Sequence, residues 1–426
     1  MSSGRGRALA SRGSLFRGAG TAVLFAACGW TSALAAPHQV WVDAAEISPA
    51  AYKVEIDPRF AAIASAFRPG PAVTGTYRFK LFVSTGGAKV RVRFSNEAGE
   101  KPLSIAAASI AVAGADDETT RGPFKKLTFG GRSEIVIPPG APAVSDPVDL
   151  PISAMSQLLV SVYVPQPLVF HPAGSVGVSV APGDQTTANH LSDAKLVVGR
   201  PIVSGILVAA AKPVPVVVTL GDSITDGARP KSGDLHGWPE VLARRLAVSK
   251  PTAGRRFAVV NAGIGGNKVL TDGWGDSALA RLDRDVLRVQ GLSDLVVLEG
   301  INDIGSSGGA PLFGDLPEIS ATDLIAGFRQ IIARAHAHNV RVIGATLTPF
   351  EGAFYYAPRK EEIRRAVNLW IRTSGEYDAI IDFDAVMRDP VHPEKLRAAY
   401  DSGDHLHPND AGYRAMGEAI SLKLLK

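Results

Sequence analysis

Residues 214–227 read VPVVVTLGDSITDG. The run at residues 214–220 is largely apolar, which is typical of a strand buried on both faces of a parallel sheet. The small polar residues after it predict a turn from the strand into a helix. Because functional residues of open parallel sheets gather outside the carboxyl ends of the strands, this stretch predicts both an α/β fold and the position of its site.

On the C-terminal side of this stretch, apolar strands alternate with amphipathic helices. This alternation predicts a parallel sheet covered on both faces, in one three-layer α/β/α domain over residues 213–426. The expected strands are residues 214–220, 257–261, 294–298, 340–347 and 379–383, and the expected helices are residues 238–248, 278–289, 322–338, 359–372 and 409–425.

On the N-terminal side the pattern changes to short runs in which apolar and polar residues alternate. Residues 77–83 and 89–94 show this period of two most clearly. Such alternation is typical of half-buried strands in an antiparallel sandwich. We expect an all-β sandwich-like domain at residues 36–212. Further strands are expected within residues 104–112, 133–137 and 158–164.

The first 35 residues have the pattern of a secretory signal peptide. They hold four arginines and no acidic residue, followed by the apolar run at residues 18–28 and by Ala33-Leu34-Ala35. The apolar run is shorter than the roughly 20 residues that a membrane-spanning helix needs. We expect a secreted or periplasmic protein. Cys28, the only cysteine, leaves lipoprotein anchoring as a minor alternative.

Composition and charge exclude several classes of protein. The chain is 46% hydrophobic and 20% charged, which excludes disorder, collagen and a coiled coil. Lysine and arginine number 45 against 41 acidic residues, and removing residues 1–35 leaves 41 of each. A neutral remainder gives no electrostatic footprint for nucleic acid. We therefore expect neither a nucleic-acid partner nor a stable membrane span.

The sequence contains no recognisable metal site. If cleavage falls near Ala35, no cysteine remains for disulfides, thiolate ligands or nucleophilic catalysis. His336 and His338 are two residues apart on a predicted helix and therefore point to different faces. No zinc site is recognisable, and we expect neither a metal nor a cofactor.

Three strand ends carry residues that can do chemistry. Ser223 follows the first strand, where its hydroxyl would be exposed near backbone N–H groups. Residues 261–267 are rich in glycine, which lets backbone N–H groups approach a substrate. Asn302, after the third strand, can donate from its amide to an oxyanion. Each motif alone is also compatible with an ordinary turn, so only their combination indicates a site.

A histidine and an aspartate that could activate this serine lie far along the chain. A serine needs an adjacent base, and the base needs an acceptor that fixes its orientation. Asp404 and His407 provide such a pair at a spacing of three. Asp401 and His405, at a spacing of four, are the alternative pair. The sheet topology would bring the nucleophile, the donors and an Asp-His pair together.

These motifs resemble the blocks of the GDSL or SGNH hydrolase family, in family order. Ile224 stands where the name-giving motif has leucine, which exchanges one apolar residue for another. The resemblance implies a flavodoxin-like three-layer hydrolase domain over residues 213–426. The blocks are Gly221-Asp222-Ser223, Gly266, Gly300-Ile301-Asn302-Asp303 and Asp404-His405-Leu406-His407-Pro408.

The resemblance also implies a role for each block. Ser223 would be the nucleophile, His407 the general base and acid, and Asp404 the partner that orients His407. The backbone N–H groups of Ser223 and Gly266, together with the Asn302 side chain, would form the oxyanion hole. The implied activity is that of a carboxylic ester hydrolase of the esterase or lipase type.

Two rival assignments are weaker. Ser307 lies in Gly305-Ser306-Ser307-Gly308-Gly309, which fits the G-x-S-x-G elbow of α/β-hydrolases, but this loop does not sit at a strand-to-helix turn. His405 could act as the base, yet the family pattern and the following Pro408 favour His407.

The substrate is less constrained than the reaction. An exported β-rich region before the hydrolase domain resembles bacterial secreted members, some of which deacetylate plant polysaccharides. We therefore expect a small-molecule or polysaccharide ester as partner, with short acyl (acetyl) groups removed from a carbohydrate. A lipase or acylhydrolase on lipid esters, an acyltransferase and an inactive glycan-binding protein stay open. The aromatic loop at residues 350–356 could stack on sugars, cover an acyl chain or pack against the sheet.

The sequence leaves two possible roles for the N-terminal β domain. It could be a structural partner of the hydrolase domain or a carbohydrate-binding module, and fold alone does not decide between them. The sequence does not indicate an oligomeric state.

Overall fold

The computed structural model describes residues 40–51, 72–114, 119–169, 177–200, 202–227, 237–250, 254–309 and 316–426. Gln39–Lys426 form one compact unit. The expected signal peptide and Cys28 lie outside the described residues. Within the described residues, the structure contains no helix that is both long enough and apolar enough to cross a membrane.

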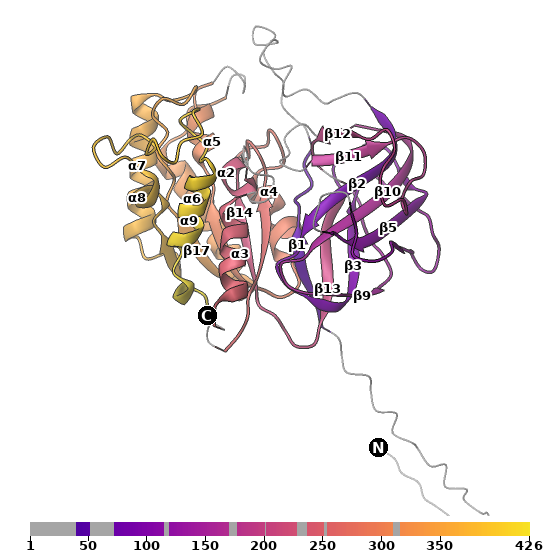
Figure 1. Ribbon diagram of the computed structural model, residues 1–426. Helices are drawn as coiled ribbons and strands as arrows, with labels where there is room; N and C mark the ends of the chain where they lie inside the picture. Colours follow the sequence, from indigo (N-terminus) through magenta and orange to yellow (C-terminus); the bar gives the residue numbers. More distant parts are fainter. Residues whose placement is uncertain are drawn as a thin grey trace, which may run out of the picture. The chain divides into compact units, whose positions relative to one another are not determined.

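The C-terminal half is built on a five-stranded sheet with the strand order β15-β14-β16-β17-β18 (Figure 1). Every neighbouring pair in this sheet is parallel. β14 is buried along its whole length and β16 from Asp294 to Leu298, as the apolar sequence predicts. The strands are β14 (Val216–Gly221), β15 (Ala258–Gly263), β16 (Leu292–Leu298), β17 (Arg341–Ala345) and β18 (Ala379–Ile381).

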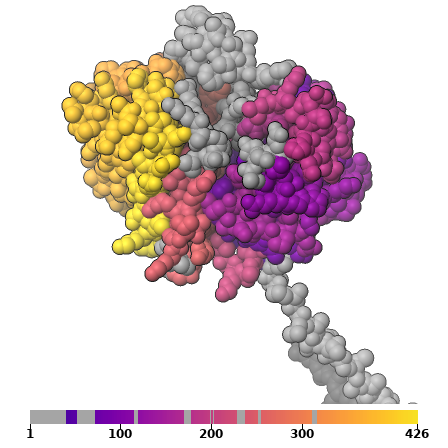
Figure 2. All heavy atoms as spheres, viewed as in Figure 1, coloured from indigo at the N-terminus to yellow at the C-terminus, as the bar shows by residue number. Residues whose placement is uncertain are grey.

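Helices connect these strands and pack in two groups. α3 and α9 lie side by side, and α8 contacts α9, while α6 contacts both α4 and α7 (Figure 1). The helices are α2 (Ser223–Asp226), α3 (Trp238–Val248), α4 (Ala278–Leu282), η3 (Asp283–Leu287), α5 (Ile301–Ser306), α6 (Ala321–Ala337), α7 (Pro358–Thr373), α8 (Phe383–Met387), α9 (Asp410–Ala419) and η4 (Leu422–Leu424). In the space-filling view, the orange and yellow residues of the C-terminal part form one continuous surface (Figure 2).

The N-terminal half consists of antiparallel sheets. One has the order β12-β11-β2-β10-β5-β6, another β1-β13-β3-β8 with β9 also on β3, and β4 pairs with β7. The strands are β1 (Val40–Glu46), β2 (Val73–Phe82), β3 (Gly87–Ser95), β4 (Leu103–Ile105), β5 (Ala107–Val112), β6 (Lys125–Lys126), β7 (Ile135–Ile137), β8 (Pro142–Val144), β9 (Val148–Ile152), β10 (Gln157–Leu168), β11 (Gly177–Ala181), β12 (Lys195–Val198) and β13 (Val203–Ala210).

This arrangement confirms the predicted fold class, a parallel α/β sheet preceded by antiparallel β sheets. The division of the chain at residue 212 stays a prediction. The apolar side chains of both halves join one core, in which Val42 of β1 and Val216 of β14 are both fully buried. The edge strand β15 is in contact with β1, so the two halves share packing beside the sheet.

Two predicted helices differ in detail from the structure. The helix expected at residues 278–289 is α4 followed by the single π-helical turn η3. The terminal helix, expected to reach residue 425, ends at Ala419 and is followed by the 3₁₀ turn η4. In the first case the chain keeps its helical direction but changes its hydrogen-bond register, a difference that apolar periodicity does not report.

Candidate active site

The turn between β14 and α2 presents Ser223. Asp222 caps α2, because its side chain accepts a hydrogen bond from the backbone N–H of Ile224 at 2.8 Å. Gly221 is required by space, since a Cβ there would lie 2.4 Å from the carbonyl oxygen of Leu298. The tight turn therefore fixes Ser223 as the first residue of α2, at the carboxyl end of a central strand.

The structure brings Ser223 and His407 together although 184 positions separate them in sequence. The Ser223 Oγ lies 2.8 Å from His407 Nε2, and His407 Nδ1 lies 2.7 Å from Asp404 Oδ2. In this order the three groups can pass a proton from serine to histidine while the carboxylate holds the imidazole in place. This is the arrangement that the sequence pattern implied for these residues.

Asp404 is held in its charged form by several donors. Its Oδ1 accepts hydrogen bonds from Ser402 Oγ and from the backbone N–H groups of Leu406 and His407. Although burial raises the pKa of Asp404, the hydrogen bond and charge of His407 and the backbone donors keep it well below its usual value. The carboxylate is therefore available to orient His407 and to stabilise the imidazolium that would form.

The predicted oxyanion donors lie on neighbouring segments at the same edge of the sheet. Gly266 has a φ of 72°, and a Cβ there would lie 2.5 Å from the Trp274 ring, so only glycine fits. The Asn302 Nδ2 donates to the carbonyl oxygen of Asn267 at 3.0 Å. An amide nitrogen carries two hydrogens, so this bond aims the group while the second hydrogen can serve a substrate oxygen.

Further contacts tie the glycine-rich loop to α5. The Asp303 carboxylate accepts from the backbone N–H groups of Val269 and Leu270 at 2.7 and 3.0 Å. Tyr355 is fully buried against Gly305 and donates from its hydroxyl to Asn302 Oδ1 at 3.4 Å. The loop after β15 and the start of α5 are therefore held as one unit.

A buried arginine that no sequence motif indicated is bonded to the turn that precedes Ser223. Arg281 is 1% exposed, and it donates to Asn267 Oδ1 and to the carbonyl oxygens of Ala262 and Gly221 at 2.9, 2.6 and 3.1 Å. Its guanidinium also lies 3.1 Å from Asp285 and 3.8 Å from Glu299. A sequence offers no signal for such a residue, because its role depends on carbonyl groups that only the fold assembles.

Buried carboxylates around this arginine have raised pKa values. Burial raises the pKa of Asp222 to about 7, although the hydrogen bond from Ile224 lowers it. Burial raises the pKa of Asp303 to about 6. Burial and the neighbouring Asp222 also raise the pKa of Glu299 well above its usual value. Arg281 is the cation that partly offsets the raised pKa of Asp222 and Glu299, and Lys268 has this effect on Asp303.

The aromatic loop after β17 divides into buried and exposed rings. Phe350 and Tyr355 are buried, which is the packing role that the sequence left open. Phe354 is 56% exposed, and its ring centroid lies 4.4 Å from that of Tyr355. An exposed phenyl ring therefore sits one side chain away from the Asn302 amide.

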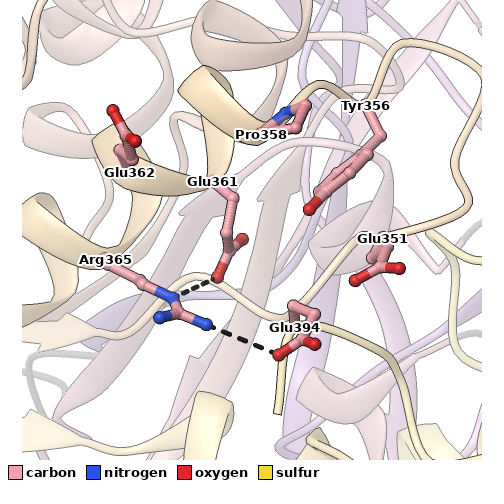
Figure 3. Close-up of a pocket in the computed structure, with 7 residues that line it drawn as sticks. All are labelled: Glu351, Tyr356, Pro358, Glu361, Glu362, Arg365 and Glu394. Carbon is pink, nitrogen blue, oxygen red and sulfur yellow. Dashed lines mark hydrogen bonds and ion pairs between the residues drawn. The ribbon is translucent and has the colours of Figure 1, made fainter. Parts of the chain in front are cut away.

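A polar hollow lies beside the same loop (Figure 3). Arg365 extends across it to Glu361 at 2.9 Å and Glu394 at 3.4 Å. Gly352, next to Glu351, packs so closely on His405 that a Cβ would lie 2.9 Å from its ring. The residues that line it are Glu351, Tyr356, Pro358, Glu361, Glu362, Arg365 and Glu394.

The rival residues have other positions. His405 Nδ1 lies 2.7 Å from Asp401 Oδ2, but the histidine in contact with Ser223 is His407. Ser307 follows α5 and accepts from the backbone N–H of Ile319 at 2.8 Å. The structure therefore favours the Ser223 arrangement over both alternatives.

His336 and His338, the two histidines of the predicted helix, make different contacts. His336 binds Asp378 at 2.8 Å, while His338 caps the end of α6. Within the residues that the structure describes, no group of three or more histidine, cysteine or acidic side chains is arranged to hold a metal ion.

Comparison with known proteins gives a match over the C-terminal part. Residues 219–415 match the model of the GDSL-like Lipase/Acylhydrolase family. The comparison with curated proteins finds no match.

Two solved structures each resemble about half of the chain. One is the acetylxylan esterase Axe2 from Geobacillus stearothermophilus, with 21% identity over 50% of this chain and 96% of that one, at a TM-score of 0.38. The other is a GDSL-like lipase from Bacteroides thetaiotaomicron, with 19% identity over 49% of this chain and 87% of that one, at a TM-score of 0.34. Both likenesses are distant.

Proposed function

We propose, from the premise that residues 219–415 belong to the GDSL-like lipase/acylhydrolase family, that this ester hydrolase removes short acyl groups from a carbohydrate. The observation that carries the catalytic assignment is the contact chain from Ser223 Oγ to His407 to Asp404, with distances of 2.8 and 2.7 Å. These distances suit proton transfer between a nucleophile and its base.

In the proposed mechanism, Ser223 Oγ attacks the ester carbonyl while His407 Nε2 takes its proton. Asp404 holds the imidazole and stabilises its positive charge. The backbone N–H groups of Ser223 and Gly266 and the Asn302 amide stabilise the negative oxygen. His407 returns the proton to the departing alcohol, leaving an acyl-serine. Water, activated by His407, then releases the carboxylic acid and restores Ser223.

The preference for a carbohydrate carrier is supported by the surroundings of the site. Carboxylates, an arginine and a tyrosine line the hollow beside the aromatic loop at residues 350–356, and such groups can hydrogen-bond to hydroxyls rather than to an acyl chain (Figure 3). The exposed ring of Phe354 offers a flat apolar surface to one face of a sugar. Export, predicted from residues 1–35, would suit a polymeric ester outside the cell.

To test the proposal, we would measure the carboxylic acid that the full chain releases from acetylated polysaccharides, from p-nitrophenyl acetate and from p-nitrophenyl palmitate. We expect acetate release that Ser223→Ala abolishes and that Ser307→Ala leaves within twofold of the wild type. Serine-dependent release from the palmitate ester alone would replace the carbohydrate proposal with a lipid ester. Acetyl transfer to an added sugar in preference to water would indicate a transferase. No serine-dependent release from any ester would overturn the catalytic assignment.

A further inference from the structure

Arg200 reaches the candidate site from the N-terminal half, outside the matched residues 219–415. Its side chain is 4% exposed. The Arg200 Nη2 donates both to Asp226 Oδ2 at 2.7 Å and to the carbonyl oxygen of Gly263 at 3.0 Å. One guanidinium nitrogen thus joins two segments of the C-terminal half.

These two segments carry the nucleophile and an oxyanion donor. Asp226 is the last residue of α2, the helix that begins at Ser223. Gly263 is the last residue of β15, and the loop with Gly266 follows directly. The segments are in close contact, since a Cβ on Gly263 would lie 2.3 Å from the backbone nitrogen of Asp226. Arg200 therefore bonds to both segments at the point where they touch, so a shift of either segment would change the distance between α2 and the end of β15.

The neighbouring carbonyl is held in the same way. Arg281 Nη1 donates to Ala262 O at 2.6 Å and to Ser48 Oγ, another residue of the N-terminal half, at 3.2 Å. Successive carbonyl groups at the end of β15 thus each accept from a buried arginine. Because β15 is an edge strand of the parallel sheet, β14 is its one backbone-paired neighbour in that sheet.

We propose that Arg200 is a positioning residue for ester hydrolysis, which holds the Gly266 loop in register with Ser223 and makes the N-terminal β region a working part of the active site. This inference rests on the proposed function of Ser223 and Gly266. The two hydrogen bonds of Arg200 described above go to Asp226 and to the Gly263 carbonyl group. Arg200 acts through the backbone, by fixing the distance between the nucleophile and the Gly266 N–H group.

The expected effect follows from the geometric demand on oxyanion donors. A displacement of about 1 Å in a catalytic constellation can cost roughly 100-fold in rate. We expect Arg200→Met to lower kcat on p-nitrophenyl acetate by about 10- to 100-fold with KM within threefold of the wild type, since the donor acts mainly in the transition state. Arg200→Lys should recover part of this loss, because an ammonium group can still reach an acceptor.

Arg288→Met is the matched control in the full chain. Arg288 also joins the two halves, through hydrogen bonds to Glu46 and Glu97 at 3.1 Å each, and these two bonds involve neither α2 nor the end of β15. We expect the melting temperature of the Arg288→Met protein to fall while its kcat stays within twofold of the wild type. Equal losses of kcat in Arg288→Met and Arg200→Met would overturn the inference, because they would reflect general loosening.

A fluorophosphonate carrying rhodamine separates this inference from the proposed function, because it labels an activated serine whatever the natural ester is. We expect Arg200→Met to label at least tenfold more slowly than the wild type, and Arg288→Met to label at the wild-type rate. A wild-type labelling rate in folded Arg200→Met would overturn the positioning role. Labelled wild-type protein that hydrolyses no ester would instead count against the proposed function.

If Arg200→Met does not fold, the same comparison is made with Arg200→Lys and Ser48→Ala. Wild-type labelling rates in both variants would overturn the positioning role.

Discussion

At the scale of single residues, Asn302 is the proposed oxyanion donor that a substitution tests most directly. Its amide is aimed by the bond to Asn267 O at 3.0 Å. Asn302→Ala should lower kcat on p-nitrophenyl acetate by about 100- to 1,000-fold, because the lost donor acts on charge that develops in the transition state. KM should change little. A kcat within threefold of the wild type, in a protein with an unchanged melting temperature, would remove Asn302 from the oxyanion hole.

A substitution at Phe354 tests whether the protein recognises a sugar as the carrier of the acyl group, and it does not test the catalytic residues. The ring is 56% exposed, and its centroid lies 4.4 Å from that of Tyr355. Phe354→Ala should raise KM for an acetylated oligosaccharide by about 2- to 10-fold, since stacking on an aromatic ring contributes roughly 0.5 to 1.5 kcal/mol. KM for p-nitrophenyl acetate should stay within twofold. Leu369→Ala, at an exposed apolar residue of α7, is the control and should change neither value. Equal effects on both esters would mean that Phe354 does not recognise the sugar.

At the scale of elements, the loop from Asp401 to Pro408 should become unstable in acid through Asp404. Its pKa in the folded protein lies below the unfolded value of about 3.9, so its contribution to stability is present above about pH 4 and is lost as the pH falls through the folded pKa. The difference in unfolding free energy between the wild type and Asp404→Asn should therefore shrink from about pH 6 to pH 2.5, as urea unfolding would measure. A difference that does not change with pH would contradict the charged hydrogen-bond set.

The elements also show where a sequence is informative. The parallel strands and the long helices α6 and α7 follow from apolar runs and from a period of 3.6. Spacing and chemistry left two Asp-His pairs open, and the family resemblance favoured Asp404 and His407 over Asp401 and His405. β13 was missed because Val203–Ala210 is buried at every position, which removes the alternation that marks a half-buried strand. The short helix α5 was missed because its six residues are too few to show a period.

The residues that support the site were beyond the reach of sequence reasoning for another reason. Arg200 and Arg281 are bonded to backbone carbonyls far away in sequence, and any arginine has the same local signature. Tyr355 lies in the aromatic loop whose role the sequence left open, and its contact with Asn302 depends on how the loop packs. Catalytic groups can be inferred from chemistry, whereas positioning groups require the fold.

At the scale of the whole molecule, the hydroxyl group of Ser84 is one of the links between the N-terminal half and the edge strand β15. The Ser84 Oγ accepts from the backbone N–H of Val259 at 3.0 Å and donates to the carbonyl oxygen of Ala44 at 3.1 Å, so it links β15 to β1. An edge strand otherwise presents unpaired N–H groups, and a buried donor without a partner costs about 1 to 3 kcal/mol.

Ser84→Ala should therefore lower the unfolding free energy by about 1 to 3 kcal/mol, as urea denaturation would measure, because it leaves the Val259 N–H and the Ala44 carbonyl without this partner. Thr120→Ala removes an exposed hydroxyl that donates to Gly122 O, so this control should change the unfolding free energy by less than about 0.5 kcal/mol. Since one core spans both halves, the loss should appear as a shift of a single cooperative transition. Two separate transitions, with only the first shifted, would show that the β region unfolds independently and that Ser84 stabilises a docked interface instead of a shared core.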